Sequence, residues 1–596
     1  MELSVEKNRF IEGASQGFLY PSVMAVLHVQ ATSNGKLAGN LEHSLIAAIP
    51  HANAHLSEVA ADDHQAEALL AATLLITHDI LLYFDYPSER LPTFHSDDLG
   101  EHHCIASVQI SCLSSRAFIN ALKIAWSALQ RAAKGGAPLD LKHPRLKSLV
   151  MQLRADAPQG FNTKHLLMEA QNRQIPWMRI WANTFQLGYG CYARLFDSSV
   201  SDSTSKIGTE LVRNKIATNT FLMAAGFPVM TSKIVTSAEM AVQEAIKMSP
   251  PVVIKPVSTE GGVGVFALLY QESEIISAFE EAQKLSRMVI IEPFFEGKDY
   301  RVHVVNGKVH GIVERQPASV VADGTSSIAQ LIVSINNERA QATDDRQYLH
   351  EIKLNAETER VCALQGYQLK DIPPANSEIR LSAICNVATG GQPIERDISV
   401  MHADNEALCI DVAQLLRLDI AGVDLIISDI GISWRESGGH ICEVNHKPQM
   451  FTSFFPEFLE SYFPASNGRI PIYLVMERDD ESPVSKIMVK ELEESYENVC
   501  WLTDSVVRTH TYQGVNNVSL MQTAKSALMN TKTDAMVLTL SPSVSIETGW
   551  SFSHCDRLIL VPHGKQTVQM MKETKLYQEI VSTLKPAKID VMTPRY

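Results

Sequence analysis

Two apolar stretches that contain acids decide how this sequence is interpreted: Ala421-Gly422-Val423-Asp424-Leu425-Ile426-Ile427 and Ile441-Cys442-Glu443-Val444-Asn445. Both are typical of buried β-strands, where an ionised carboxylate is costly unless it is paired or holds a cation. Glu443 and Asn445 are two residues apart, so on a strand they point to the same face. Together with Asp424 they form an oxygen-only donor set, which predicts a magnesium site.

Upstream, two lysines and a glycine-rich loop provide what a triphosphate requires. Lys215 and Lys255 are separated by a helix and a strand, and Lys255 follows Val252-Val253-Ile254, so its ammonium can project from a sheet toward a phosphate. The next loop, Ser258 to Val265, contains glycines whose backbone N–H groups can approach phosphate oxygens closely. A single glycine loop is also typical of an ordinary turn, so this interpretation depends on the downstream acids.

The rest of the sequence divides into three parts. Residues 1–160 mix extended and helical patterns and predict an α+β domain. Residues 161–465 contain short β-branched stretches, glycine turns and helices, and they include the acids and lysines above. Residues 466–596 alternate strands such as Ile470 to Met476 with helices such as Ser485 to Tyr496, which predicts a small parallel sheet. The predicted fold class is therefore a multidomain protein of α/β and α+β parts.

Composition limits the partners. The chain has 596 residues and a net charge of −15, with no long basic block, so we expect no nucleic-acid or membrane partner. Its most apolar stretch, Ala68 to Thr77, is far shorter than the roughly 20 residues that cross a bilayer. The N-terminus has no basic segment followed by an apolar one, and the nine cysteines are scattered. These features predict a cytoplasmic protein.

The motifs together resemble the ATP-grasp superfamily and, within it, cyanophycin synthetase. The resemblance covers most of the chain, and its motifs follow one another in one order. They are Ile175 to Arg179, Gln186 to Gly190, Ser203 to Ser205, Asn214-Lys215, Ala225 to Val229, Glu296 to Val302, Glu314-Arg315, Asp323-Gly324, Asn386, Thr389 to Gly391, His402, Asp424 and Glu443 to Asn445.

This resemblance implies two α+β lobes that grip ATP together with Mg2+. Glu292 to Phe295 would form the adenine hinge, and the metal ligands would be Asp424, Glu443 and Asn445. The implied catalytic residues, which hold phosphate or the activated carboxylate, are Arg301 and Arg315, and Arg380 is a third candidate, for the reason given below. The implied cofactor-binding residues are Lys215, Lys255, Ser258, Thr259, Gly261, Gly262, Glu292, Phe294, Phe295 and Asp299. The implied substrate-binding residues are Ser203, Thr204, Ser205, Thr389, Gly390 and Gly391.

The sequence departs from cyanophycin synthetase in the ATP-binding part. Gly261 and Val263 stand where that family has His and Arg, and the loop is more similar to the glutathione synthetase type. Ser382 stands where the family has an arginine, four residues before Asn386. Arg380 lies on the same face of the expected strand and is the candidate replacement.

A second departure lies after Gly468-Arg469-Ile470-Pro471-Ile472. In cyanophycin synthetase this segment leads into a Mur-ligase-like module with a P-loop, whereas here Glu477 to Ser482 contain no G-x-x-x-x-G-K-[ST] pattern and four of the six are acids. Acids there would repel a triphosphate. The sequence therefore predicts a truncated Mur-ligase-like α/β domain without an ATP site.

The resemblance implies an ADP-forming carboxylate–amine ligase that acts through an acyl phosphate on peptide or amino-acid substrates. The leading expectation is polymerisation of β-aspartyl-arginine dipeptides into cyanophycin or a related polymer, by a homodimer or homotetramer. One alternative is a short-peptide ligase of the glutathione synthetase type, which the Ser258-Thr259 loop favours. The other is an ATP-binding subunit whose catalysis has decayed, motivated by Ser382 and Gly261.

Overall fold

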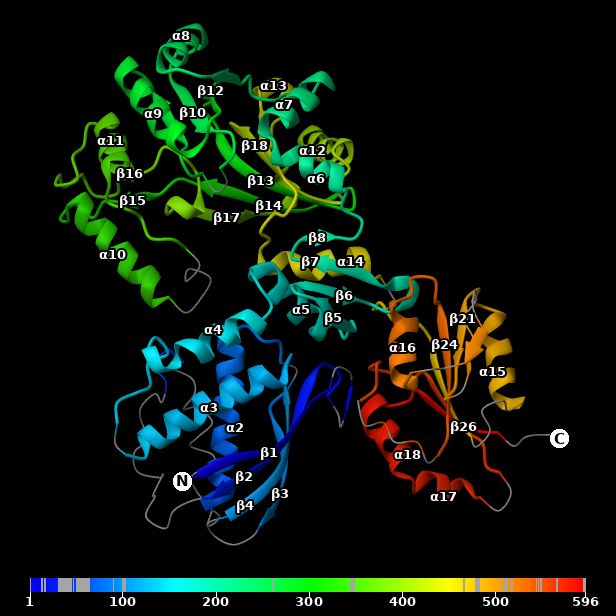
Figure 1. Cartoon of the computed structure of the whole chain (residues 1–596). Helices are drawn as coiled ribbons and strands as arrows, with labels where there is room; N and C mark the ends of the chain where they lie inside the picture. Colours follow the sequence, from blue (N-terminus) through cyan, green and yellow to red (C-terminus); the bar gives the residue numbers. More distant parts are fainter. Residues whose placement is uncertain are drawn as a thin grey trace. The chain divides into compact units, whose positions relative to one another are not determined.

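A computed structural model describes most of the chain (Figure 1). It groups the chain into two compact units, Met1–Ser198 with Tyr462–Tyr596, and Ser199–Ser461, and each is described by itself. The described residues are 2–11, 14–15, 18–30, 46, 48–49, 65–88, 90–98, 103–134, 136–259, 262–342, 349–464, 467–477, 483–504, 506–508, 513–515, 518–542, 544, 546, 549–563 and 566–592.

The first unit begins with an antiparallel sheet in the order β1-β2-β4-β3. Its strands are β1 (Glu2–Ile11), β2 (Ser22–Gln30), β3 (Thr93–Asp98) and β4 (His103–Ser111), and helices α2 (Gln65–Tyr83) and α3 (Ser115–Ala132) contact it. Alternating burial along β2 turns one face to these helices. Within the described part of the chain, α2 is the one helix long and apolar enough to cross a membrane, and 61% of the relevant stretch is buried, as in the core helix of a globular domain.

Downstream in the same unit, α4 (Lys147–Asp156) and α5 (Phe161–Asn172) precede an antiparallel sheet that includes β5 (Trp177–Trp181), β6 (Thr184–Leu187) and β7 (Arg194–Asp197). The first compact unit ends at Ser198 and resumes at Tyr462. The division at residues 160 and 465 that the sequence suggests stays a prediction.

The C-terminal part of the first unit is a seven-stranded sheet in the order β23-β22-β21-β24-β20-β25-β26. Its five strands β21 (Val499–Leu502), β24 (Ala535–Leu540), β20 (Ile472–Met476), β25 (Arg557–Leu560) and β26 (Lys588–Val591) run parallel. Strands β22 (Val506–Arg508) and β23 (Gln513–Val515) are antiparallel. Parallel pairing agrees with the α/β alternation in the sequence.

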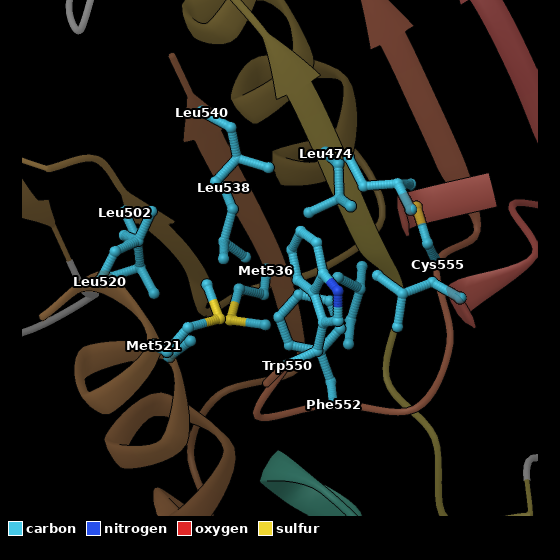
Figure 2. Packing of buried hydrophobic residues seen from close by; sticks show 14 of the residues in the cluster. Leu474, Leu502, Leu520, Met521, Met536, Leu538, Leu540, Trp550, Phe552 and Cys555 are labelled. Atoms are coloured by element: carbon cyan, nitrogen blue, oxygen red, sulfur yellow. The ribbon is translucent and has the colours of Figure 1, made fainter. Parts of the chain in front are cut away.

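Both faces of this parallel sheet are buried. Alternate residues of β20 enter two different apolar cores, Leu474 into one and Val475 into the other. The core that contains Leu474 packs Trp550 and Met536 against α16 (Leu520–Met529), as Figure 2 shows. The core that contains Val475 includes residues of α15 (Pro483–Glu493).

The second unit, Ser199–Ser461, contains two larger sheets. The first, in the order β11-β10-β12-β9, is antiparallel and shares an apolar core with helices α8 (Ala238–Met248) and α9 (Glu272–Leu285) (Figure 1). The second, in the order β17-β14-β13-β18-β19, has α12 (Ala403–Leu415) on one face. Their strands are β9 (Lys233–Val235), β10 (Val252–Pro256), β11 (Phe266–Leu269), β12 (Val289–Pro293), β13 (Lys298–Val305), β14 (Lys308–Gln316), β17 (Gln392–Arg396), β18 (Ile420–Ile427) and β19 (His440–Asn445).

An insertion between β14 and β17 builds a third, smaller layer in this unit. Strands β15 (Ser319–Val321) and β16 (Glu378–Arg380) pair with each other and pack with α10 (Ile328–Gln341) and α11 (Ala356–Leu364) around a separate apolar core. Both units contain β-sheets together with helices, which confirms the predicted fold class of a multidomain α/β and α+β protein.

Candidate active site

One face of the five-stranded sheet carries the predicted charged residues. Tyr300, Val302 and Val304 of β13 face the core below α12, so the alternate residues of β13 point to the opposite face. On that face Arg301 pairs in register with Asp424 of β18, which pairs in turn with Glu443 of β19. Strand register thus brings together three of the residues that the sequence singles out.

Asp424 is held by two arginines. It is 2% exposed, Arg315 donates to its Oδ2 at 2.8 Å and Arg301 donates to the same oxygen at 3.0 Å. Burial raises the pKa of Asp424, but Arg301 and Arg315 outweigh burial and hold that pKa below its ordinary value. The carboxylate is therefore ionised and bound to two guanidinium groups.

Arg315 also binds Asp299, to which its Nε donates at 3.0 Å. The pKa of the Asp299 carboxyl is raised, first by burial and also by the nearby negative charge of Asp424, although Arg315 opposes both. Asp299, Arg315, Asp424 and Arg301 form one continuous ion network on this face.

Two lysines of the site are paired as well. Lys255, on β10, is 8% exposed, and its Nζ lies 2.7 Å from a carboxylate oxygen of Glu292 on β12, which is 4% exposed. Burial lowers the pKa of Lys255, but Glu292 outweighs burial and the net shift is upward. Lys215 begins α7 (Lys215–Ala224), and its Nζ lies 3.5 Å from Glu443 and donates to the carbonyl of Thr259 at 3.2 Å.

The glycine loop after β10 folds back toward a second turn. Thr259 Oγ1 donates to the carbonyl of Val263 at 2.8 Å, and Gly262 has a φ of +76°, which favours glycine. A Cβ on Gly262 would lie 2.6 Å from the side-chain Nδ2 of Asn386, so the loop approaches the segment that leads to Gly391. Gly261, which the resemblance assigns to cofactor binding, lies outside the described residues.

The turn after Asn386 is built by its own hydrogen bonds. Thr389 Oγ1 and the N–H of Gly391 both donate to the carbonyl of Asn386. The buried Arg339 of α10 donates to the carbonyl of Gly390 at 3.1 Å. The three predicted substrate-binding residues of this turn are thereby fixed opposite the glycine loop.

Comparison with known proteins identifies this part of the chain. Residues 214–324 match the family described as prokaryotic glutathione synthetase, ATP-grasp domain. The chain contains an ATP-grasp domain. The chain is 33% identical over 347 residues to the cyanophycin synthetase of Trichormus variabilis, and the match covers 56% of this chain and 38% of that protein.

The chain is similar to other proteins as well. The glutathione biosynthesis bifunctional protein GshAB of Pasteurella multocida is 29% identical over 271 residues, which cover 44% of this chain and 35% of that protein. A solved structure of a bifunctional glutathione synthetase from Pasteurella multocida covers 58% of this chain and 52% of that one, with 24% identity and a TM-score of 0.39. The chain spans less than half of the length of these curated relatives.

Some predicted residues of the ATP-grasp domain have partners that the sequence does not indicate. The resemblance assigns Glu292 to an adenine hinge, whereas in the structure its carboxylate lies against Lys255, because β10 and β12 pair in an antiparallel register. Phe294 donates its backbone N–H to the carbonyl of Pro251 at 2.9 Å, and the ring of Phe295 lies edge-on to His440. Their role toward adenine stays a prediction.

Arg380 and the loop Ser203 to Ser205 are held by local contacts. Arg380 donates to the carbonyls of Ser382 and Ala383, so its guanidinium binds its own loop rather than the Asp424 network. Thr204 Oγ1 donates to Asp419 at 2.6 Å, and Ser205 Oγ caps α6 (Lys206–Arg213) by accepting from the N–H of Gly208. Contact of these residues with substrate stays a prediction.

The proposed metal ligands lie close together on this face. Glu443 has a side chain that is 34% exposed, and the buried Nδ2 of Asn445 has no partner among the described residues. The described part of the chain contains no group of three His, Cys, Asp or Glu side chains placed to hold a metal ion. Even so, two carboxylates and an amide on adjacent strands are oxygen donors of the kind that magnesium prefers, so the chemistry of these residues fits that ion.

Two further features of the site were missed in the sequence. Gly422 lies on β18, two residues before Asp424. A Cβ at this position would be 2.8 Å from Arg301 Cδ, so the glycine leaves room for the Arg301 side chain to pass over β18. A bulge between Asp424 and Leu425 leaves Cys442 as an extra residue on β19, and bulges often re-aim side chains at active sites. A glycine inside an apolar strand is the signal from which the close approach of Arg301 could have been predicted.

Proposed function

We propose that this chain is an ADP-forming carboxylate–amine ligase that acts through an acyl phosphate. The observation that carries the proposal is the charge balance of the site. Among the residues that the structure describes, four cations are each paired with a carboxylate: Lys215 with Glu443, Lys255 with Glu292, Arg301 with Asp424 and Arg315 with Asp299. Four buried or half-buried cations on one site are costly unless anions compensate them, and phosphate oxygens are anions that can replace the four carboxylates as partners.

The same balance indicates how the nucleotide arrives. Because the four cations are already neutralised by four carboxylates, free ATP would bring an excess of negative charge into the site. Magnesium would supply the missing positive charge when bound to the triphosphate, with Glu443, Asn445 and Asp424 as the residues that would hold it. Lys215 and Lys255 would then exchange their carboxylate partners for phosphate oxygens.

The reaction requires charge stabilisation rather than a covalent enzyme intermediate. A substrate carboxylate oxygen forms a bond to the γ-phosphorus while the bond from that phosphorus to the β-phosphate oxygen breaks, and ADP leaves. The amine nitrogen then bonds to the acyl carbon, loses a proton to water, and phosphate leaves. Arg301 and Arg315 would hold the transferred phosphoryl group or the carboxylate, and electrostatic stabilisation contributes most of the rate enhancement in such transfers.

For the substrate we propose β-aspartyl-arginine dipeptides, polymerised into cyanophycin or a related polymer by a cytoplasmic homodimer or homotetramer. The similarity to cyanophycin synthetases supports this substrate class. The absence of a P-loop sequence after Ile472 supports a form with one ATP site per chain. The net charge of −15 supports the proposal that neither nucleic acid nor a membrane is a partner.

A second candidate is a short-peptide ligase of the glutathione synthetase type. The match of residues 214–324 to the glutathione synthetase ATP-grasp model favours it. A third candidate, a subunit with decayed catalysis, is motivated by Ser382 and Gly261 but opposed by the four retained cations.

The test is ADP release with Mg–ATP and three substrate sets: β-aspartyl-arginine dipeptide with a primer, aspartate plus arginine with a primer, and γ-glutamyl-cysteine plus glycine. Product that grows on the primer with the dipeptide supports the polymerase, and a single product from the third set supports the short-peptide ligase. ATP binding without ADP release in any set would contradict the ligase proposal. The Lys255→Met variant is the control for ADP release by contaminating enzymes.

A further inference from the structure

His303 lies one row away from Arg301 on the same face of the five-stranded sheet. In register His303 faces Gly311 of β14 on one side and Gly422 of β18 on the other. Gly422 in turn faces Asn445 of β19. This row, which we call the neutral row, has no charged side chain, and its two glycines leave His303 and Asn445 as its only polar side chains.

Neither polar group in the neutral row is satisfied. His303 is 2% exposed, and both of its ring nitrogens lack a hydrogen-bond partner among the described residues. The buried Nδ2 of Asn445 lacks one as well. Buried polar groups are nearly always hydrogen-bonded, so unpartnered ones beside a binding site call for an explanation such as a ligand.

The imidazole is a neutral donor and acceptor. Burial, aided by Arg301, lowers the pKa of His303 to about 3, so the ring carries no charge at neutral pH. A neutral imidazole offers one N–H donor and one nitrogen acceptor. It therefore matches a group that also has one donor and one acceptor and no charge.

Three side chains lie over the two glycines that flank His303. The ring of Phe454 lies over the Gly311 side, with its centroid 5.3 Å from that of His303. The aliphatic part of Arg301 lies over the Gly422 side while its guanidinium binds Asp424. Pro448 lies over the Gly422 side as well, since a Cβ on Gly422 would be 2.8 Å from Pro448 Cβ. An anion that draws Arg301 away from Asp424 would open the part of this space that Arg301 fills and would make His303 more accessible to the substrate.

We propose that His303 is a specificity-determining residue that, with the side-chain amide of Asn445, binds a peptide amide of the substrate next to Arg301. The proposal rests on the proposed ligase function. A peptide amide has one N–H donor and one carbonyl acceptor and no charge, as the neutral row requires. The ammonium and carboxylate groups of a single amino acid are charged and would have to be paired with protein groups of opposite charge. The neutral row contains no charged side chain. Substrates with a preformed amide, such as dipeptides, are therefore favoured over single amino acids.

The test measures binding of β-aspartyl-arginine dipeptide, by calorimetry in the presence of Mg2+ and a non-hydrolysable ATP analogue. His303→Leu removes both nitrogens and keeps an apolar side chain of similar size, whereas His303→Gln keeps a donor and an acceptor. His310→Leu is the matched control, because His310 on β14 is mostly buried and lies outside the neutral row. Neither of its ring nitrogens has a hydrogen-bond partner among the described residues, although Nδ1 lies 4.0 Å from a carboxylate oxygen of Glu457. We expect His303→Leu to weaken dipeptide binding about 10-fold, the effect of one lost hydrogen bond.

The controls separate recognition from folding. His303→Gln should bind the dipeptide within about 3-fold of the unmodified protein, His310→Leu should be unchanged, and all three variants should bind the ATP analogue normally. Dipeptide binding that is equal in His303→Leu and His310→Leu, or absent from the unmodified protein, would overturn the inference. If His303-dependent binding is seen but no product forms, the inference stands and the ligase proposal fails. If product forms and the KM for the dipeptide is the same in the unmodified protein and in His303→Leu, the ligase proposal is supported and the inference about His303 is wrong.

Discussion

The five-stranded sheet of the ATP-grasp unit and the parallel C-terminal sheet both bury a carboxylate, but they satisfy it in different ways. Asp424 is bound by the guanidinium groups of two other strands. Glu477, 1% exposed at the end of β20, lies 3.2 Å from His563 and near the hydroxyl of Ser485. The hydroxyl of Ser485 bonds in turn to Thr539, which accepts from Trp501.

The difference separates exchangeable acids from structural ones. The guanidinium groups around Asp424 are permanently charged, so they can exchange this carboxylate for an anionic ligand of higher charge. Each arginine would then still be paired with an anion. The polar groups around Glu477 form a network of contacts with one another among the described residues. Buried charge therefore marks a site when its partners are cations, and it marks a core when its partners are mostly neutral.

We expect the largest effect from a substitution in the ion network of Asp424. Asp424→Asn leaves Arg301 and Arg315 without their shared carboxylate charge, so the free energy of unfolding should fall by about 3 to 5 kcal/mol. ADP release should fall by about 100-fold or more, because the arginines lose their positions. Urea unfolding and the ADP-release assay measure the two effects.

The control for this variant is Asp590→Asn in the parallel sheet. Arg557 keeps a second partner, Glu491, at 2.7 Å, so its charge stays compensated. The control should lose about 1 kcal/mol or less and should release ADP normally. A similar loss of stability in both variants would contradict the distinction between the two sheets.

A substitution of Glu477 in the parallel C-terminal sheet should have a smaller effect, on stability alone. Glu477→Gln keeps the shape of the side chain but removes the charge that His563 contacts, so the free energy of unfolding should fall by about 2 kcal/mol. The KM for ATP and the rate of ADP release should not change. A folded variant with impaired ADP release would show that the C-terminal sheet takes part in the reaction.

Acid should weaken the ATP-grasp unit through His303. The folded-state pKa of about 3 lies below the ordinary value of 6.5, so the unfolded chain binds a proton first as the pH falls. This contribution is absent above pH 6.5 and destabilises the folded protein progressively below it. Between pH 6.5 and 5.0 the unmodified protein should lose about 2 kcal/mol more than His303→Leu. Parallel stability curves for the two proteins would contradict the assigned burial of the imidazole.

The smallest effect concerns the glycine loop. Gly262→Ala puts a Cβ on a residue with φ +76° and within 2.6 Å of Asn386 Nδ2, so we expect about 1 kcal/mol of strain and a KM for ATP that rises a few-fold. Gly226→Ala is the matched control, since φ is +84° there and nothing lies within 4 Å of the added atom. The control should show the strain without the change in KM, as thermal melting and ATP titration would reveal.

Local patterns in the sequence predict several strands and the face on which some charged side chains lie, whereas the role of these side chains stays a prediction. The strand before Lys255, the acid on an apolar strand and the same-face pair Glu443 and Asn445 follow from alternation alone. The predicted C-terminal strand Ile470 to Met476 is confirmed as β20, which begins two residues later, at Ile472.

Partners between distant strands could not be derived in this way. The contact of Lys255 with Glu292 depends on how β10 and β12 align, and the contact of Arg315 with Asp424 depends on the order of three strands. His303 was hidden because it interrupts a stretch of valines that predicts only a buried strand. Which face such a residue occupies becomes clear only when the register with both neighbouring strands is known.

The division of the chain into units has a consequence for its synthesis. The ATP-grasp unit, Ser199–Ser461, interrupts the other unit, whose two parts are joined by hydrogen bonds such as those from Tyr189 to Gly468 and from Cys191 to Thr533, both 2.8 Å. The ribosome therefore releases every residue of the ATP-grasp unit before the last partners of the first unit exist. Domains generally fold as units during synthesis, so we expect the inserted unit to fold first and the segment around Tyr189 to wait for the C-terminal residues.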